Sequence, residues 1–151
     1  MEGFLSLMPK FRVAHLTSVH PRYDPRIFVK MCSSLAENYD VSLIVADGKG
    51  CEIKNNVSIL DVGKSKKGRL FRIVQSVKRV YNKALVTDAD IYHLHDPELM
   101  PVGLKLKRLG KRVIFDSHED FPEQILNKHY LNYQIRRIIS IIMKLYEKYA
   151  C

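Results

Sequence analysis

An apolar run changes abruptly to four ionisable groups within five positions in the segment VIFDSHEDFPEQI. His118 stands there among other polar side chains: Asp116, Ser117, Glu119 and Asp120. Neighbouring carboxylates would hold the tautomer of the imidazole and raise its pKa. Such a histidine can donate a hydrogen bond to a phosphate or a sugar hydroxyl, or take part in proton transfer. The alternative is that Ser117 to Asp120 only cap the next turn of the chain.

A second polar cluster is the segment HLHDPE, residues 93–98. On a strand, His93 and His95 lie on the same side and could begin a metal site. The sequence has no H-x-H-x-D-H run and no second histidine pair, so we expect no metal. We expect Asp96 to cap the helix that follows, with Glu98 favourably placed in its first turn. Alternatively, both histidines are interior side chains with satisfied hydrogen bonds.

The third polar cluster is the loop SVHPRYDPR. It contains no glycine, so the G-x-G-x-x-G pattern that binds dinucleotides is absent, and we expect neither NAD nor FAD. The loop places four side chains beside a predicted helix N-terminus: His20, Arg22, Tyr23 and Arg26. This set is suited to a phosphate or to an acceptor rich in hydroxyl groups. The alternative is a charged surface turn that Asp24 caps.

Alternating strands and helices must position these clusters. Short β-branched runs predict strands at residues 12–18, 41–47, 57–63, 91–96 and 112–116. Helical spacing of apolar residues predicts helices at 25–38, 70–85 and 99–109, the first capped by Asp24 with Pro25 next, the last stopped by Gly110. Only 41–47 and 57–63 follow each other without a helix. We therefore expect an α/β fold, a Rossmann-like open parallel sheet with helices on both faces. All three clusters then follow the carboxyl ends of strands, where such sheets bind ligands.

Basic residues dominate the chain, which carries a formal net charge of +9. Seven of them surround the apolar stripe of the second predicted helix: Lys66, Lys67, Arg69, Arg72, Lys78, Arg79 and Lys83. This composition suits an anionic membrane surface or a polyphosphate, although a solvated basic face on a core helix explains it as well. No nucleic-acid module is visible, so we do not expect nucleic acid as a partner.

Three scattered cysteines, an odd number without metal or redox spacing, are typical of reduced thiols in a cytosolic protein. The first residues have no basic leader or cleavage site, and no apolar run is long enough to span a membrane. We therefore expect a cytoplasmic protein, peripheral on the inner face of the membrane if it is bound there. Residues 132–150 predict a helix with a broad apolar face, which would allow self-association and suggests a truncated unit.

Two segments together carry a resemblance to a known family: RVAHLTSVHPRYDPRIFVKMCSSLAENYDVSLIVADG and DADIYHLHDPELMPVGLKLKRLGKRVIFDSHED. They resemble the amino-terminal half of family-4 glycosyltransferases of the GT-B fold, bacterial surface-polysaccharide enzymes in particular. The resemblance covers nearly the whole chain and is most specific over residues 88–120. It implies that residues 1–151 are an amino-terminal, acceptor-binding Rossmann-like domain, incomplete at its carboxyl-terminal end and without the domain that binds the nucleotide sugar.

The resemblance also implies roles for individual residues. His118 matches the histidine that faces the donor sugar in a retaining transfer, and the loop from His20 to Arg26 matches the acceptor-side loop. His95, Asp96 and Glu98 would line the same cleft. The orienting or capping groups would be Asp116, Glu119 and Asp120. No cofactor is implied, and the expected acceptor is a saccharide or a lipid-linked sugar. Two alternatives stay open: half of a GT-B nucleotide-sugar epimerase, and a non-catalytic module that binds polyanions or membrane surfaces.

Overall fold

A computed structural model describes residues 11–64 and 69–116 of the chain. Its elements are, in order, β1 (Arg12–Leu16), η2 (Pro25–Cys32), α1 (Ser33–Leu35), β2 (Asp40–Val45), β3 (Glu52–Lys54), β4 (Val57–Asp61), α2 (Arg69–Thr87), β5 (Ile91–Leu94), η3 (Pro97–Leu99), α3 (Met100–Arg108) and β6 (Arg112–Phe115). Of these, η2 is a π-helix and η3 a single 3-10 turn. The predicted apolar helix at 132–150 lies outside the described residues.

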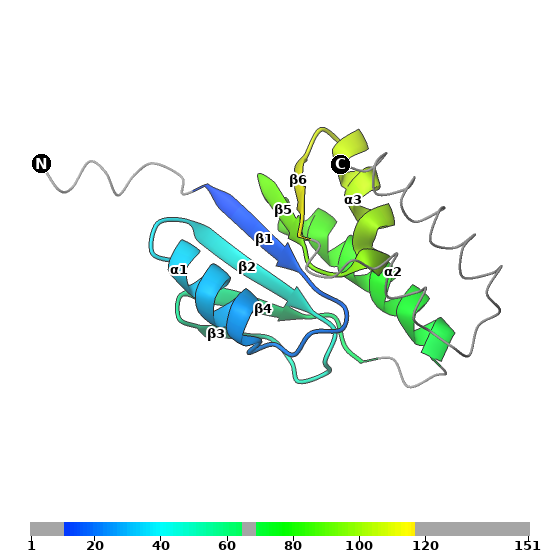
Figure 1. The fold of residues 1–151 in the computed structure, drawn as a ribbon, viewed down its shortest axis with the longest axis horizontal. Coiled ribbons are helices and arrows are strands. Elements are labelled where there is room, and N and C mark those ends of the chain that lie inside the picture. The colour runs from blue at the N-terminus through cyan, green and yellow to red at the C-terminus, as the bar shows by residue number, and fades with distance from the viewer. Residues whose placement is uncertain (1–10, 65–68, 117–151) are drawn as a thin grey trace, which may run out of the picture.

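The strands form one six-stranded sheet in the order β3-β4-β2-β1-β5-β6 (Figure 1). Neighbouring strands are parallel except β3, which pairs antiparallel with β4. The predicted α/β fold with an open, mostly parallel sheet is therefore confirmed. The chain builds outward from β1 to β2 and β4 and then returns to β5 on the other side of β1. The strand order thus reverses between β1 and β5.

The sequence analysis missed the strand β3, because it predicted no element between residues 47 and 57. It forms a hairpin with β4, in which Lys54 pairs with Val57 across a two-residue turn. The turn residues Asn55 and Asn56 both have positive φ, at 51° and 59°. Asparagine adopts this backbone conformation more readily than most residues, and two such residues make the tight turn that suits a hairpin.

Helices cover both faces of the sheet (Figure 1), and each face has its own apolar core. Successive strand residues point to opposite faces, so alternate positions of β1 belong to different layers. Ala14 and Leu16 pack with residues of α2 and α3, such as Val80 and Leu106. On the other face η2 and α1 cover β2 and β4, where Phe28 of η2 belongs to the core. The predicted covering of both faces is therefore observed.

The helix predicted at residues 25–38 is shorter and wider than expected. Asp24 caps it as predicted, because its carboxylate accepts hydrogen bonds from the backbone N–H groups of Arg26 and Ile27. The first eight residues form a π-helix, in which the hydrogen bonds span one residue more than in an α-helix. Ile27 and Cys32, five residues apart, are consequently both buried against the sheet.

The carboxyl-terminal end of α3 follows the prediction that Gly110 stops it. Gly110 has a φ of 78°, the left-handed conformation that glycine adopts without strain. Its N–H donates to the carbonyl of Lys107, and the next N–H, that of Lys111, donates to Leu106. The turn that follows delivers the chain into β6. Among the described residues, no helix is both long and apolar enough to cross a membrane.

Candidate functional site

Three segments meet where the strand order reverses: the loop after β1, the loop after β5, and Asp116, the last described residue, directly after β6. Strands β1 and β5 are hydrogen-bonded neighbours, and β6 lies on the far side of β5. These segments, together with the first turns of η2 and η3, contain most of the described residues that the sequence singled out: His20, Arg22, Tyr23, Asp24, Arg26, His95, Asp96, Glu98 and Asp116. His118, Glu119 and Asp120 lie outside the described residues, so their predicted roles stay predictions.

Asp96 joins the loop after β5 to the loop after β1. Its side chain is almost fully buried, and its Oδ2 atom accepts a hydrogen bond of 2.8 Å from the Thr17 hydroxyl. The same oxygen accepts from the backbone N–H and the hydroxyl of Ser18. The Ser18 hydroxyl also lies 3.0 Å from Glu98 Oε1, so the two carboxylates share its one proton. This network fixes the two loops against each other at the reversal point.

The predicted capping role of Asp96 is wrong in one respect. Asp96 precedes the turn that begins at Pro97, but its side chain makes no capping hydrogen bond to that turn. The carboxylate instead points across to the loop after β1, where Thr17 and Ser18 already occupy it. Glu98 does lie in the first turn, as predicted.

His20 lies between two carboxylates. Its Nε2 atom is 3.2 Å from Asp96 Oδ1, and its Nδ1 atom is 3.5 Å from Asp24 Oδ2. The backbone N–H of His20 donates to the Thr17 hydroxyl at 3.0 Å, which fixes the loop beneath the ring. The imidazole remains one-third exposed, so it is held in place and still reachable by a ligand.

Arg26 and Asp116 form a second polar pair at the same end of the sheet. Arg26 Nη1 lies 3.0 Å from Asp116 Oδ2, which connects the start of η2 to the end of β6. The backbone N–H of Asp116 donates to Leu94 of β5 at 2.9 Å. The carboxylate oxygen also lies 3.7 Å from His93 Nε2 and 3.7 Å from His95 Nδ1. Asp116 thus faces both the loop after β1 and the histidines of β5.

Arg22 points away from this group of residues. Its guanidinium is buried and donates to both oxygens of Asp47, at 2.8 and 2.6 Å, to a Glu52 carboxylate oxygen, and to the Gly50 carbonyl at 2.9 Å. Hydrogen bonding to Asp47 is the main cause that raises the pKa of Arg22 above its ordinary value. Tyr23 donates to Glu52 as well, at 2.8 Å. Arg22 and Tyr23, two of the predicted acceptor-binding residues, thus bind the segment between β2 and β4.

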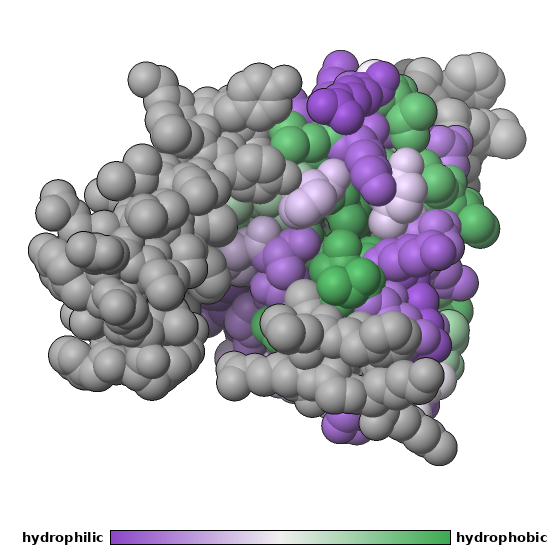
Figure 2. All heavy atoms as spheres, turned by 90° about the vertical axis from the view of Figure 1, so that its right-hand side faces the viewer, coloured by the Kyte–Doolittle hydropathy of each residue, from purple (hydrophilic) through white to green (hydrophobic). Residues whose placement is uncertain are grey.

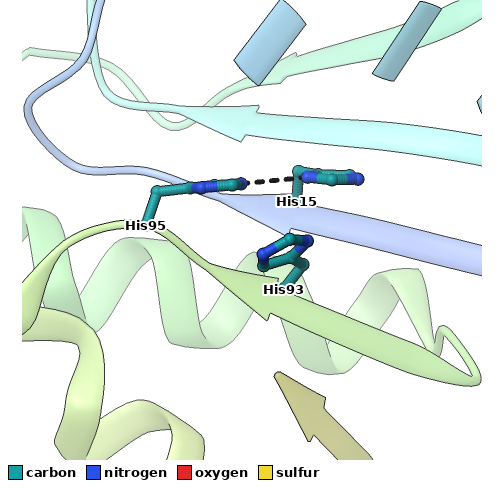
Figure 3. A group of neighbouring side chains, drawn as sticks. All are labelled: His15, His93 and His95. Atoms are coloured by element: carbon teal, nitrogen blue, oxygen red, sulfur yellow. Dashed lines mark hydrogen bonds between the residues drawn. The ribbon is translucent and has the colours of Figure 1, made fainter. Parts of the chain in front are cut away.

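A group of three imidazoles lies beneath the loops, on the sheet face opposite α2 and α3 (Figure 3). His15 belongs to β1 and His93 to β5, and His95 is the first residue after β5. His15 and His93 are aligned partners in the two strands. His15 Nδ1 and His95 Nε2 are joined by a hydrogen bond of 2.9 Å, and the rings of His93 and His95 stack with centroids 4.5 Å apart. The prediction that His93 and His95 share one side is confirmed.

Burial controls the protonation of this group. His15 is inaccessible to solvent, and burial, assisted by repulsion from His93, lowers its pKa to about 3. His15 is therefore a neutral imidazole at physiological pH. Its Nε2 atom is buried and has no hydrogen-bond partner among the described residues. A neutral imidazole has one nitrogen that carries a proton and one that can accept a hydrogen bond or bind a metal ion, and its tautomer decides which is which.

The sequence analysis did not identify His15. The signal was a single polar side chain inside the apolar run RVAHL, and its importance depends on β5, which comes more than seventy residues later. Once β1 and β5 are neighbours in a parallel sheet, His15 and the H-x-H pair fall on the same face. Sequence periodicity predicts each strand but not which strands will be adjacent.

The predicted basic face of α2 is described only in part. Lys66 and Lys67 lie outside the described residues, and the side chains of Arg69 and Arg72 are likewise outside them. Lys78 is exposed, whereas Arg79 and Lys83 are partly buried, Arg79 with its guanidinium 3.5 Å from the Gly63 carbonyl. Figure 2 shows hydrophilic and hydrophobic side chains interspersed on the side that carries α2 and α3.

Comparison with known proteins adds no family to this description. No family model matches the sequence, and no curated protein matches it.

Proposed function

We propose that residues 1–151 form the acceptor-binding side of a retaining glycosyltransferase of the GT-B architecture. The observation that carries this proposal is the gathering of polar side chains where the strand order reverses: His20, Arg26, Asp96, Glu98 and Asp116. Open parallel sheets bind their ligands at this place. The sequence resemblance assigns acceptor-facing residues to the same loops, so both lines of argument favour one edge of the sheet.

The charges at this edge favour hydroxyl groups over phosphate. The segments after β1, β5 and β6 carry four described carboxylates, Asp24, Asp96, Glu98 and Asp116, against two guanidiniums: Arg22, which Asp47 and Glu52 bind, and Arg26, which pairs with Asp116. Carboxylates accept hydrogen bonds from hydroxyl groups, whereas they repel a phosphate. The acceptor therefore contacts these loops through sugar hydroxyls. Any phosphate of a lipid-linked acceptor lies away from them.

The remaining parts of the proposal come from the resemblance. His118 faces the donor sugar and stabilises the transferring glycosyl group, and Asp116, Glu119 and Asp120 orient or cap around it. The nucleotide-sugar donor binds mainly to the second domain of the GT-B architecture. No metal or other cofactor takes part in the transfer. The protein works in the cytoplasm, at the inner face of the membrane when the acceptor is lipid-linked.

Contact with a membrane surface is supported by one exposed stripe on α2. Val74 and Lys78, one helical turn apart, are exposed, and so is Leu85, two turns further along the helix. Apolar side chains next to a cation suit the interface of an anionic bilayer. Binding to vesicles with and without anionic lipid tests this contact. Lys78→Glu should weaken it, and Lys30→Glu, at an exposed position of η2, is the matched control.

The deciding experiment is sugar transfer by the natural polypeptide that contains these residues. It is supplied with UDP-, GDP- and dTDP-sugars and with saccharide or lipid-linked acceptors. We expect His118→Ala to lower kcat by roughly a hundredfold or more, a typical effect for a group that acts in proton transfer or charge stabilisation. Glu98→Gln should raise KM for the acceptor more than KM for the donor. Glu37→Gln, at an exposed position away from the three loops, is the control.

Two results would reject the proposal. One is the absence of transfer from every nucleotide sugar tested, and the other is full activity of the His118→Ala protein. Interconversion of a nucleotide sugar without any acceptor would favour the epimerase alternative instead. Vesicle binding without either reaction would favour the non-catalytic module.

A further inference from the structure

We infer that His15, His93 and His95 form a binding site for a divalent transition-metal ion of the Zn²⁺ type. One nitrogen from each imidazole lies within 4.8 Å of those of the other two. In a tetrahedral site with Zn–N bonds of about 2.0–2.1 Å, ligand nitrogens are roughly 3.3 Å apart. His15 Nδ1 and His95 Nε2 are already closer, at 2.9 Å. Small rotations of the rings would therefore place all three nitrogens around one ion.

The chemistry of the three side chains favours this class of ion. Imidazole nitrogen is a good ligand for Zn²⁺, Co²⁺, Ni²⁺ and Cu²⁺ and a poor one for Mg²⁺ or Ca²⁺. A metal ion needs the neutral ring, which is the form that burial favours. His15 is fully buried and His95 nearly so, so the interior of the sheet holds a polar group where apolar side chains are usual. Coordination would replace the hydrogen bond between His15 Nδ1 and His95 Nε2 by a bond from each nitrogen to the ion.

A carboxylate stands where metal-binding histidines commonly have one. His95 presents Nε2 to His15 and Nδ1 to Asp116, at 2.9 and 3.7 Å. A carboxylate behind the ring fixes its orientation and makes the other nitrogen a better ligand. Arg26 in turn holds Asp116 at 3.0 Å. The separation of 3.7 Å is an ion-pair distance, so Asp116 would become a positioning residue once the ring rotation that closes the site brings His95 Nδ1 within hydrogen-bond distance of it.

The site would crosslink the two central strands where the strand order reverses. Its ligands come from β1 and from β5 with the residue that follows it, which are far apart in sequence. Because the ligands lie in β1 and at the end of β5, the ion would hold the loops that follow these two strands in place. This inference does not depend on the proposed glycosyl transfer. Metal binding without transfer activity, or the reverse, would separate the two.

The test uses Co²⁺ as a spectroscopic probe of the whole chain, freed of metal with EDTA. We expect one equivalent of Co²⁺ to bind, with the visible absorption of a tetrahedral ion, a raised Tm, and displacement by Zn²⁺. His93→Gln, the least buried of the three, should weaken binding at least tenfold. Asp116→Asn should weaken it about tenfold to a hundredfold, the usual effect of removing a carboxylate behind a ligand. His20→Gln is the matched control and should bind like the wild type.

A measurement on the unaltered protein guards against variants that do not fold. Pulsed electron paramagnetic resonance with Cu²⁺ counts the coordinated imidazoles, and three are expected. The exposed thiol of Cys51 is a competing ligand, so Cys51→Ser should leave the binding of Co²⁺ unchanged. Absence of stoichiometric binding, fewer than three imidazoles, a thiolate charge-transfer band, or equal weakening by His20→Gln would each overturn the inference.

Discussion

His20 Nε2 lies 3.2 Å from Asp96 Oδ1, and this contact joins the loop after β1 to the end of β5. The two residues are far apart in sequence, yet they meet because β1 and β5 are neighbours with parallel direction. The contact between His20 and Asp96 therefore depends on the pairing of β1 with β5, the two strands between which the strand order reverses. It places an imidazole and a buried carboxylate at the position where an open sheet receives its ligand.

Replacing Asp96 by alanine should lower the free energy of unfolding by about 2–4 kcal/mol, because the buried hydroxyl of Thr17 and the partly buried donors of Ser18 lose a charged acceptor. Glu98→Ala is the matched control, since Glu98 is only partly buried and accepts from the Ser18 hydroxyl. Its effect should stay below about 1 kcal/mol. Urea unfolding of both variants measures the difference. Equal losses would show that Asp96 has no special structural role.

A second prediction concerns the buried guanidinium of Arg22. Arg22→Met should lower the free energy of unfolding by about 2–4 kcal/mol, because Asp47 would remain partly buried without its partner. Arg26→Met, which removes an ion pair at a more exposed position, should lower it by less than about 1 kcal/mol. Thermal and urea unfolding measure both variants. If Arg26→Met were the more damaging, Arg22 would not be the structural arginine of this loop.

The ion pairs of Arg22 with Asp47 and Glu52 predict how the free energy of unfolding changes with pH. Hydrogen bonds from Arg22 lower the pKa of Asp47 and, together with Tyr23, that of Glu52. Because both folded-state pKa values lie below the unfolded ones, the contribution is complete above about pH 4–5. It is lost as the pH falls through the folded-state values. The stability gap between the wild type and Arg22→Met should therefore narrow in acid. The explanation would be contradicted if the difference in the free energy of unfolding between the two proteins stayed constant from pH 7 down to the lowest pH at which both are still folded.

Sequence patterns predicted the parts of the fold that depend on local order. The apolar runs around Ala14 and Tyr92 indicated buried parallel strands, and Asp24 and Gly110 indicated the ends of helices. What the sequence did not predict depends on contacts between distant segments. Asp96 was expected to cap the helix that follows it, but hydroxyl and N–H groups from the loop after β1 compete for its carboxylate. His15 was overlooked because its neighbours come from β5.

The last prediction concerns the two described cysteines, Cys32 and Cys51. Cys32 is fully buried in η2, and burial raises the pKa of its thiol to about 12, whereas Cys51 is exposed. The thiolate is the form that reacts with iodoacetamide, and at pH 8 roughly one Cys32 thiol in ten thousand is ionised. Burial also blocks access, so Cys32 should react only as fast as the protein unfolds. Cys51 should be alkylated at the rate of an ordinary accessible thiol.

Trypsin separates these two cysteines at Lys49, so peptide mass spectrometry follows each alkylation rate independently. In concentrated urea the two rates should become similar, because unfolding removes both the burial and the raised pKa of Cys32. That condition is the control for intrinsic reactivity. Alkylation of Cys32 as fast as Cys51 in the folded protein would mean that η2 opens readily from the sheet. The core formed by Ile27, Phe28 and β2 would then be far less stable than its complete burial implies.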